Sequence, residues 1–415
     1  MNRPHILILG AGFGGMYVAR KLVSLVEKGA IDVTIIDESN YFLFTPLLHE
    51  VATGGLSPGS VAEPLREIYA GTDIEVVQGK VDAINLGEQT VQVKHGSYSR
   101  ILGYDHLVIA TGATTNYYDI SGAERCCVPL KDLSDASHIR AEIIEAFEQA
   151  YISDDPVERS QLLTFTIIGG GATGVELAGE MAEFTRVLHD RYYLACEEPK
   201  VVLIHAGVDL LEQFPPSLRK SALKRLENMG VDVRCEHRVT EVTDKSLSML
   251  DCNGNVITLP GNLVVWTAGV KPNIPRFDGD QPHYQGSRLL IDEYGHLEGQ
   301  EKVYALGDVA ASLDKLPMLA QVAVTQSKFI SKNIVASLMN DKPKKIRYRS
   351  KGSMVSIGQW YALGRLYGIN IHGPLTWWLW RTVYLMKFSS LQKRFRIVIE
   401  CTLDLFYSRD ITTFE

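Results

Sequence analysis

The chain has 415 residues, of which 46% are hydrophobic and 22% charged, with a formal net charge of −7. This length predicts two or three domains with ample buried core, and the composition excludes a disordered or low-complexity chain. The six cysteines show no C-x-x-C pair and no metal-ligand spacing, so we expect free thiols, a reducing compartment and no metal site. The sequence enters its first strand at once, with no room for a signal peptide, and we therefore expect a cytoplasmic chain.

The charge is unevenly distributed along the chain. From Lys342 onward, 13 lysines and arginines face four acids, a charge of +9, whereas the preceding residues carry −16. A basic tail on an acidic body favours an anionic surface as partner. Because this tail is rich in Trp and Leu and lacks a nucleic-acid motif, we expect an anionic membrane surface and no nucleic acid.

The first predicted element is an apolar strand, residues 6–9, that runs into a G-x-G-x-x-G turn from Gly10 to Gly15. In such a turn the glycines allow a tight bend, the approach of a pyrophosphate, and close packing of the next helix, expected at residues 16–25. The following strand, residues 33–36, ends in Asp37, 22 residues after Gly15, where a ribose hydroxyl needs an acceptor. A mere tight turn or a solvated acid is the alternative for each feature alone, but together they predict a dinucleotide site.

Three further segments complete the first predicted domain. Residues 41–54 are too apolar for a free loop and are broken by Pro46, so we expect them to line a cofactor or substrate cavity, with a buried crossover as the alternative. Alternating runs at residues 74–77 and 90–93 predict a small antiparallel meander. A buried strand at residues 107–110 would bring Thr111 and Gly112 to the same ligand if it lies beside the first strand.

The opening pattern occurs a second time. After a helical stretch at residues 133–151, a strand at 164–168 precedes a second G-x-G-x-x-G turn, Gly169 to Gly174, a helix at 175–191 and a strand at 201–204 that ends in His205. A second meander (231–235, 247–250 and 256–259) and a closing strand (263–269) follow. Two nucleotides are therefore expected. Residues 303–308 return to the first domain and end in Asp308, which either caps a helix or approaches a ligand.

This order of elements resembles the two-domain flavoprotein reductases of the glutathione reductase fold, in which the first unit holds FAD and the second NAD(P)H. The chain lacks the reactive cysteines of the disulfide, CoA-disulfide and sulfide:quinone members. Over essentially its whole length it is similar to the type II NADH dehydrogenase (NADH:quinone oxidoreductase) family. The motifs that carry this resemblance are NYFLFTPLL (40–48), GGGATGVE (169–176), LAGE (177–180), WTAG (266–269), AQVA (320–323), KGS (351–353), WWLW (377–380) and LFYSRD (405–410).

The resemblance implies an α/β fold with two Rossmann-like dinucleotide-binding domains and a C-terminal amphipathic helical region that docks on a membrane. We expect residues 1–120 and 271–370 to bind FAD, residues 121–270 to bind NAD(P)H, and residues 371–415 to form the docking helices. The implied cofactor is FAD, the donor NADH and the acceptor a membrane quinone. The resemblance also implies a peripheral position on the cytoplasmic face of the membrane and suggests a homodimer.

Three residues receive chemical roles from the resemblance. It places Glu176 by the nicotinamide and flavin, Gln321 near the quinone side of the flavin, and Lys351 close to the isoalloxazine, where a cation stabilises the reduced flavin. The plainer alternatives are a helix-dipole contact, a surface helix position and membership of the basic tail, respectively. The residues expected at FAD are Gly10, Gly12, Phe13, Gly14, Gly15, Asp37, Thr45, Val81, Thr111, Gly112, Asp308, Ala320, Gln321 and Lys351. The residues expected at NAD(P)H are Gly169, Gly171, Gly174, Glu176, His205 and Gly269.

Two positions depart from the family pattern. The strand-end acid of the second unit is His205 here, and a histidine cannot repel a 2′-phosphate as a carboxylate does, so NADPH use is less excluded. The motif Ala-Gln-x-Ala-x-Gln ends in Thr325, with Gln326 next. A hydroxyl at Thr325 can bond a quinone carbonyl, but the motif is incomplete.

The tail does not predict a membrane-spanning helix. Residues 374–388 are shorter than the roughly 20 apolar residues of a span and contain Arg381 and Lys387. From Phe395 onward, apolar positions follow helical spacing on one face. This pattern predicts helices in the interface of an anionic leaflet, or packed on the protein itself or on a dimer mate. The residues that define the face are Val398, Ile399, Thr402, Leu405 and Phe406.

The sequence therefore predicts a FAD-dependent NAD(P)H:quinone oxidoreductase that passes hydride to the flavin and two electrons to a membrane quinone. Two alternatives remain. One is a sulfide or disulfide oxidoreductase acting through Cys126 and Cys127. The other is a non-enzymatic redox sensor that binds NAD(P)H and recruits partners through its tail.

Overall fold

The computed structural model describes residues 3–192, 198–312, 316–388, 390–403 and 409–412. The chain forms two compact units, each assembled from three stretches of sequence. Unit 1 comprises Met1–Leu43, Ala62–Thr114 and Val270–Arg349, and unit 2 comprises Phe44–Val61, Thr115–Gly269 and Ser350–Glu415. The limits expected at residues 120, 270 and 370 are assignments of cofactors to segments and stay predictions.

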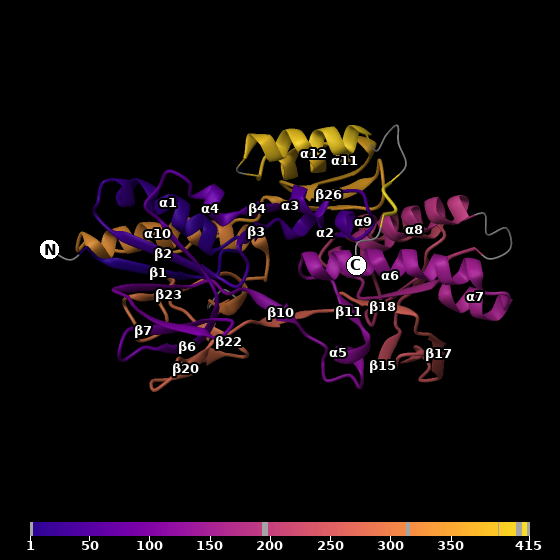
Figure 1. Cartoon of the computed structure of the whole chain (residues 1–415), viewed down its shortest axis with the longest axis horizontal. Coiled ribbons are helices and arrows are strands. Elements are labelled where there is room, and N and C mark those ends of the chain that lie inside the picture. The colour runs from indigo at the N-terminus through magenta and orange to yellow at the C-terminus, as the bar shows by residue number, and fades with distance from the viewer. Residues whose placement is uncertain (1–2, 193–197, 313–315, 389, 404–408, 413–415) are drawn as a thin grey trace. The chain divides into compact units, whose positions relative to one another are not determined.

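Unit 1 is built on a parallel sheet with the strand order β23-β9-β1-β2-β5. The helices α1 (Gly15–Glu27) and α10 (Ala320–Leu338) pack side by side on one face of it (Figure 1). An antiparallel meander packs its apolar side chains against the other face. Because both faces are covered, the central strands are continuous apolar runs. The five strands are β1 (His5–Leu9), β2 (Asp32–Asp37), β5 (Glu75–Gln78), β9 (His106–Ile109) and β23 (Val303–Ala305).

The meander of unit 1 is a sheet in the order β20-β6-β7-β8, and smaller ladders complete the unit. The remaining elements of unit 1 are β3 (Tyr41–Leu43), β4 (Ala62–Pro64), α4 (Leu65–Ile68), β6 (Lys80–Asn85), β7 (Thr90–His95), β8 (Tyr98–Gly103), β10 (Ala113–Thr115), β19 (Val270–Pro272), β20 (Arg276–Asp278), β21 (Tyr284–Gln285), β22 (Arg288–Leu290), η2 (Gly307–Val309) and β24 (Ala310–Ala311).

Unit 2 repeats this plan with a parallel sheet in the order β11-β18-β12-β13-β14. The helices α6 (Leu133–Ile152) and α8 (Ala172–Tyr192) contact one face, and an antiparallel meander packs on the other (Figure 1). The strands are β11 (Val128–Pro129), β12 (Thr164–Ile168), β13 (Lys200–Ile204), β14 (Asp232–Arg234) and β18 (Leu263–Trp266), with β15 (Arg238–Val242), β16 (Ser246–Leu250) and β17 (Val256–Pro260) in the meander.

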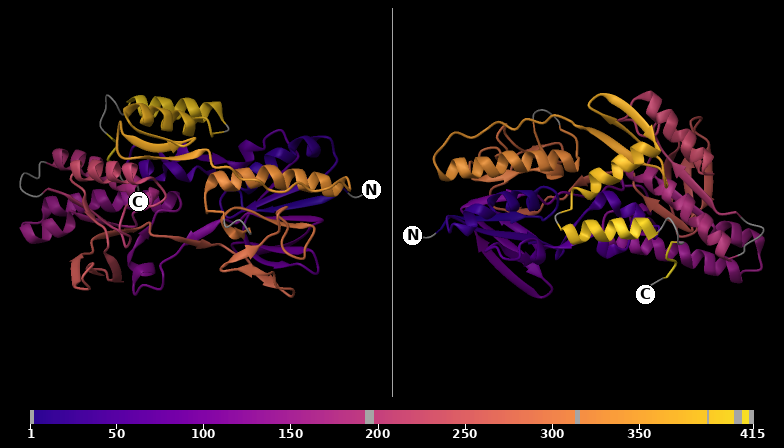
Figure 2. Two further views of the ribbon diagram at one scale, coloured as in Figure 1. Left: turned by 180° about the vertical axis from the view of Figure 1, so that it is seen from behind. Right: turned by 90° about the horizontal axis from the view of Figure 1, so that it is seen from above.

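The C-terminal part of unit 2 is an antiparallel sheet, β25-β26-β27, followed by two helices that are yellow in Figure 2. Among the described residues, no helix is both long and apolar enough to cross a bilayer. The remaining elements of unit 2 are η1 (Thr45–Leu47), α2 (Leu48–Val51), α3 (Pro58–Val61), α5 (Ala123–Cys126), α7 (Pro156–Leu162), α9 (Pro216–Asn228), β25 (Gly352–Ser356), β26 (Ala362–Leu366), β27 (Ile369–Gly373), α11 (Pro374–Leu385) and α12 (Leu391–Leu403).

The predicted α/β fold with two similar parallel sheets is confirmed, and the predicted strand at residues 107–110 does pair with the first strand. One prediction is wrong in both copies. The first strand assigned to each meander, near residues 74–77 and 231–235, is instead an edge strand of the parallel sheet, β5 or β14. The meanders are formed by the strands that follow, because a short alternating run does not reveal which partner it pairs with.

Candidate functional site

The first glycine turn lies between β1 and α1, at the carboxyl edge of the unit 1 sheet. Gly10 has φ +94°, and its N–H donates to the Ile36 carbonyl at 2.7 Å. A Cβ on Gly15 would collide with the Gly10 carbonyl, so α1 can start this close to β1 only with glycine there. By contrast, no atom lies within 4 Å of a Cβ built on Gly12. The turn therefore fits a pyrophosphate, which would approach the backbone at Gly12 and the first N–H groups of α1.

Asp37, the last residue of β2, holds this turn from the side. Its Oδ2 accepts from the Ala11 N–H at 2.6 Å and its Oδ1 from the Ser39 N–H at 2.8 Å. Burial raises the pKa of Asp37, whereas the two N–H groups act in the opposite direction. Each carboxylate oxygen still has a second acceptor position, so Asp37 can also bind a ribose hydroxyl.

Other residues predicted at FAD lie in the same unit. Thr111 and Gly112 follow β9 and Asp308 follows β23, so the parallel strands bring them to the edge that holds the glycine turn. Asp308 lies inside η2, and the N-caps of η2 and α10 are Leu306 and Leu319, so the capping alternative for Asp308 is wrong. The other unit 1 positions are Phe13, whose ring meets Phe42 edge-on, Gly14 at the N-cap of α1, Val81 on β6, and Ala320 and Gln321 in the first turn of α10.

The second glycine turn, between β12 and α8, has the same backbone geometry. Gly169 has φ +121°, and its N–H donates to the Ile204 carbonyl at 2.8 Å. A Cβ on Gly174 would collide with the Gly169 carbonyl, whereas no atom lies within 4 Å of one on Gly171. Gly269 follows β18, and its carbonyl accepts from the Asn116 N–H at 3.1 Å. Unit 2 therefore holds a second turn that fits a dinucleotide pyrophosphate.

His205, directly after β13, takes the place that Asp37 has in unit 1. Its Nδ1 accepts from the Gly170 N–H at 3.2 Å, so this nitrogen carries no proton in this arrangement. Its Nε2 lies 3.7 Å from Oε1 of Glu212, an exposed carboxylate that sequence reasoning missed. The acid absent at position 205 is thus supplied beside the same strand end by Glu212.

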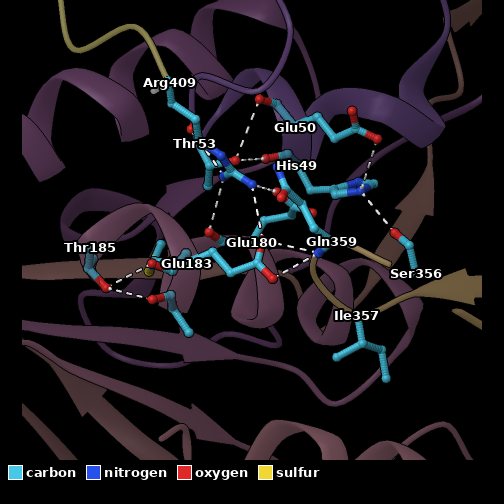
Figure 3. Close-up of polar contacts among 12 residues, drawn as sticks. His49, Glu50, Thr53, Glu180, Glu183, Thr185, Ser356, Ile357, Gln359 and Arg409 are labelled. Atoms are coloured by element: carbon cyan, nitrogen blue, oxygen red, sulfur yellow. Dashed lines mark hydrogen bonds and ion pairs between the residues drawn. The ribbon is translucent and has the colours of Figure 1, made fainter. Parts of the chain in front are cut away.

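A cluster of buried charges surrounds the first half of α8 (Figure 3). Glu176, Glu180 and Glu183 occupy one face of the helix, as their spacing of four and three residues requires. Glu50 of α2 joins them, and two arginines from the C-terminal segment face the four acids. Since the acids outnumber these arginines, at least one carboxyl group is expected to stay protonated.

Glu50 and Glu180 each bind one arginine. Nη1 of Arg381 donates to both oxygens of Glu50 at 2.7 Å, and the guanidinium also lies over the rings of Trp377 and Trp380. Nη2 of Arg409 donates to Glu180 at 2.6 Å. Charge-assisted contacts of this kind satisfy two carboxylates that would otherwise be costly to bury.

Glu183 is held by a third group of donors. Its carboxylate accepts from Arg409 at 3.2 Å and from the Gln359 N–H at 2.8 Å, and it lies 3.8 Å from Arg225. Burial and the neighbouring Glu180 raise the pKa of Glu183, whereas the arginines lower it. The two C-terminal arginines are therefore committed to Glu50, Glu180 and Glu183.

Glu176 has no arginine partner in this cluster. Among the residues that the structure describes, its Oε1 accepts a single, long hydrogen bond, from the Ser356 N–H at 3.3 Å, and its Oε2 lies 3.9 Å from Nδ1 of His49. Burial raises the pKa of Glu176 well above its ordinary value, and the nearby Glu50 and Glu180 raise it further. Of the four carboxyl groups, Glu176 is the one without an arginine contact, and its raised pKa favours the protonated form.

His49 stands between two of these carboxyl groups. Its Nε2 lies 4.0 Å from Glu50 and 3.4 Å from the Ser356 hydroxyl, on the side opposite the Nδ1 that faces Glu176. Burial lowers the pKa of His49, with Glu50 and Glu180 acting against that and Arg381 and Arg409 with it. His49 is thus a neutral ring with one nitrogen directed to each acid.

A close approach of two backbones positions this cluster. A Cβ on Gly179 would lie 2.8 Å from the Gly358 nitrogen, so the turn between β25 and β26 can reach α8 only at a glycine. This contact brings the Ser356 and Gln359 N–H groups to Glu176 and Glu183. A small cavity of about 20 Å³ lies alongside, with room for about one water molecule. Its lining includes Glu50, Glu180, Arg381, Arg409 and Cys401.

Two family models match the chain. The pyridine nucleotide-disulphide oxidoreductase model matches residues 4–327, and the NDH2 C-terminal domain model matches residues 350–410. The chain is 30% identical over 422 residues to the type II NADH:quinone oxidoreductase Ndh of Mycobacterium tuberculosis, an alignment that covers 98% of this chain and 89% of that protein. It is 32% identical over 425 residues to a probable NADH dehydrogenase of Dictyostelium discoideum, with 100% and 92% covered.

The chain belongs to the type II NADH:quinone oxidoreductase family. The structure of NDH2 from Plasmodium falciparum in complex with NADH matches its fold with a TM-score of 0.92 at 21% identity, over 99% of this chain and 100% of that one. The family resemblance stated from the sequence is confirmed.

In this type II oxidoreductase, the remaining predicted site residues are not among those that contact the buried charged cluster. Thr45 is the exposed first residue of η1, and Lys351 is exposed directly before β25. Thr325 donates its hydroxyl to the Gln321 carbonyl at 2.8 Å, within α10. Its neighbour Gln326 is buried and accepts from the Gly307 N–H at 2.7 Å, which ties α10 to η2. The roles predicted for Gln321 and Lys351 stay predictions.

The cysteines of this type II oxidoreductase do not have the features of a redox pair. Cys126 and Cys127 are free thiols; Cys126 donates to Asp244 at 3.1 Å, and burial raises the pKa of Cys127 to about 12. A thiol protonated at neutral pH is a poor nucleophile. No observation on these two residues favours the sulfide or disulfide alternative.

Proposed function

We propose that this chain is a FAD-dependent oxidoreductase that transfers electrons from NADH to a quinone and docks on a membrane surface. Family membership and the names of the relatives support NADH and quinone as substrates. The observation that carries the proposal is the combination of two dinucleotide turns of equal geometry with a buried carboxyl group two residues after the second turn, whose raised pKa favours the protonated form. A redox sensor would have no need of that proton.

FAD is assigned to unit 1 and NADH to unit 2. Gly10, Gly12 and Gly15 would hold the FAD pyrophosphate, and Asp37 would accept from its ribose. Gly169, Gly171 and Gly174 would hold NADH in the same way. When bound, the flavin supplies hydride acceptance from NADH and electron transfer to the quinone.

The protein itself must manage a proton. The net reaction, NADH + H⁺ + quinone → NAD⁺ + quinol, consumes one proton from the surroundings. The raised pKa of Glu176 favours its protonated form, and Glu176 is the general acid in this proposal. His49 Nδ1 lies 3.9 Å from Glu176, so a small side-chain movement would let the ring take up a proton at Nε2 and release one from Nδ1 to Glu176.

NADH is the preferred donor in this proposal. The 2′-phosphate of NADPH would bring its charge to the end of β13, where the Glu212 carboxylate lies 3.7 Å from His205. Repulsion by Glu212 replaces the repulsion that a strand-end acid normally provides. Because Glu212 is exposed, this discrimination is expected to be modest.

The helices α11 and α12 form the proposed membrane surface. Leu391, Phe395 and Ile399 share one face of α12 and are 65%, 67% and 57% exposed, while Leu375 and Trp378 are exposed on α11. Such faces suit insertion at a bilayer interface. Leu405 and Phe406, also predicted on this face, lie outside the described residues. The cytoplasmic face and a homodimer stay predictions.

The basic charge of the tail contributes less to docking than the sequence suggested. Arg381 and Arg409 are buried in ion pairs, and Arg396 pairs with Glu400 at 3.0 Å. Apolar insertion therefore carries more of the proposed binding than attraction to anionic lipids. Because Arg381 and Arg409 neutralise buried acids, removing the whole tail would disrupt unit 2, and substitution of Leu391, Phe395 and Ile399 by serine is the cleaner test of docking.

The activity is tested by measuring oxidation of NADH and NADPH with a short-chain quinone in protein that retains FAD. We expect turnover with NADH above NADPH, and release from vesicles in the triple serine variant with turnover on the soluble quinone retained. Absence of turnover with both donors in FAD-loaded protein would refute the proposed enzyme. Flavin reduction without reoxidation by any quinone would instead favour a redox sensor.

A further inference from the structure

A basic hollow lies in unit 1 between α1, α10 and the segment that follows α10. It is open and has a volume of about 800 Å³. Five lysines line it together with a single acidic residue, Asp341. Lys21 comes from α1, Lys328 and Lys332 lie four residues apart on one face of α10, and Lys342 and Lys344 follow that helix. None of the nucleotide-turn residues lines this hollow.

The two lysines after α10 are held in place by buried backbone contacts. The Asn333 side chain is buried, and its Oδ1 accepts from the Lys344 N–H at 2.7 Å while its Nδ2 donates to the Lys344 carbonyl at 2.9 Å. The Asp341 N–H donates to the Ala336 carbonyl at 2.7 Å, which turns the chain back toward α10. The fold therefore fixes Lys342 and Lys344 beside the helix instead of leaving them on a free strand of chain.

The lysines gather without neutralisation by the protein. Among the described residues, none of the five makes an ion pair within 4 Å, although Lys345, next to them, pairs with Glu293 at 2.7 Å. Like charges at this density repel one another, and a solvated face has no need to be hollow or fixed by a buried asparagine. The C-terminal dipole of α10 favours cations at Lys342 and Lys344, but Lys328 lies in the middle of α10 and Lys21 belongs to α1.

We propose that this hollow is a binding site for a small, multiply phosphorylated anion. Ammonium groups bind phosphate oxygens through charge-assisted hydrogen bonds, and the volume falls in the range of small-molecule sites, roughly 300–1,000 Å³. Val335 and Ala336 are the apolar residues of the lining, and no aromatic side chain of the described residues lines the hollow, so the phosphates and not a base or acyl chain are recognised. A concave site without exposed apolar anchors suits a dissolved anion better than a lipid surface.

The basic residues that the sequence analysis treated as one tail belong to two different parts of the structure. Lys342 and Lys344 belong to unit 1, whereas α11 and α12 belong to unit 2. The positive excess thus serves two surfaces, and the proposed site is independent of membrane docking and of the proposed oxidoreductase activity.

The test is calorimetric titration of the flavin-loaded full chain with inorganic triphosphate at low salt. We expect saturable binding that weakens steeply with salt, and a loss of affinity of roughly tenfold or more in K328Q/K332Q, because two charge-assisted contacts are removed. The matched control is K220Q/K224Q, which removes two exposed lysines with the same spacing from α9 in unit 2. A second variant, K342Q/K344Q, should give a similar loss while the backbone bonds to Asn333 remain.

The outcomes separate the sources of phosphate. Adenosine triphosphate should bind about as tightly as inorganic triphosphate, since only phosphates are recognised. No saturable binding of triphosphate, or an equal loss in the α9 control, would overturn the proposal. Binding of anionic-lipid vesicles that depends on these lysines, without binding of triphosphate, would show a lipid headgroup surface and would also overturn it.

Discussion

The two glycine turns share one backbone geometry and differ in the side chain that braces them. In unit 1, Asp37 accepts from the Ala11 N–H, and in unit 2, His205 accepts from Gly170, the residue at the same place in the turn. A carboxylate and an imidazole nitrogen thus perform the same structural task. The difference shows that the strand-end residue can brace the turn without being a carboxylate.

The helices that follow the turns differ more strongly. Counted from the first glycine of each turn, Glu176 and Glu180 of α8 correspond to Tyr17 and Lys21 of α1. The second helix directs carboxyl groups into a buried cluster, whereas Lys21 faces an open basic hollow. The first copy therefore has the features of a holder of cofactor, and the second those of a reaction site.

The largest effect is expected from Glu176→Gln, because an amide in place of the carboxyl group cannot donate the proton that the reaction consumes. Quinone turnover should fall by roughly 100-fold or more, the usual contribution of a general acid, while flavin reduction by NADH remains rapid. Stopped-flow measurement of the two half-reactions separates these steps. Equal slowing of both half-reactions would contradict a role of Glu176 in proton donation. The matched control is Glu227→Gln, which changes an exposed glutamate of α9.

The same variant has a predicted pH signature. The folded protein raises the pKa of Glu176 above its ordinary 4.5, so between these values the native state holds a proton that the unfolded chain has released. The free energy of unfolding contributed by this group is therefore fully present below the ordinary pKa and falls as pH rises through the raised pKa. Denaturant unfolding should show that Glu176→Gln gains stability relative to the parent as pH rises. A constant difference across pH would contradict a raised pKa.

The second prediction compares the two turns by substituting alanine for Gly12 in unit 1 and, separately, for Gly171 in unit 2. Open space surrounds a Cβ at both positions, so both variants should fold. Gly12→Ala should lower flavin retention, whereas Gly171→Ala should leave flavin bound and raise the KM for NADH by roughly 100-fold, because two hydrogen bonds to phosphate at about 1.5 kcal/mol each are lost. Flavin content by absorbance and NADH kinetics provide the readouts. The reverse pattern would exchange the cofactor assignment of the two units.

The third prediction concerns the braces themselves. Asp37→Asn loses one of two accepted N–H bonds because an amide has a single acceptor oxygen, and flavin affinity should fall by roughly tenfold, about 1.5 kcal/mol. His205→Asn keeps its one acceptor task and should change NADH binding little. Equilibrium dialysis of FAD and NADH titration measure both. A larger loss in His205→Asn would mean that the imidazole contacts the ligand directly.

The smallest effect is expected from donor choice. Glu212→Gln should raise the efficiency with NADPH relative to NADH by roughly fivefold, the scale of an exposed charge interaction near 1 kcal/mol. His205→Asp should shift preference toward NADH by restoring the acid found in unit 1. The ratio of kcat/KM for the two donors is the measurement. An unchanged ratio in Glu212→Gln would show that Glu212 does not discriminate between NADPH and NADH.

The repeated sheets could be predicted because their signals are local: an apolar run, a glycine turn and an amphipathic helix follow one another directly. The pairing of β5 and β14 could not, since Glu75–Gln78 alternates like any exposed-edge strand and its partner is set by long-range packing. The turns were located residue by residue, and Glu176 was singled out only through family resemblance.

The buried cluster was mostly beyond sequence reasoning because its partners are distant in the chain. Arg381 and Arg409 meet acids at positions 50 and 180, and no periodicity links them. One signal was available, however. Glu50 lies in an otherwise apolar run, and a charged residue that must be buried requires a partner of opposite charge.

The burial of Arg409 has a consequence for synthesis on the ribosome. Glu180 and Glu183 emerge more than two hundred residues before the guanidinium that neutralises them. Domains generally fold as units during translation, but unit 2 cannot complete its charged interior until the last residues have left the exit tunnel. The ion pairs in the interior of unit 2 therefore form only after the segment that carries Arg409 has been synthesised, long after Glu180 and Glu183.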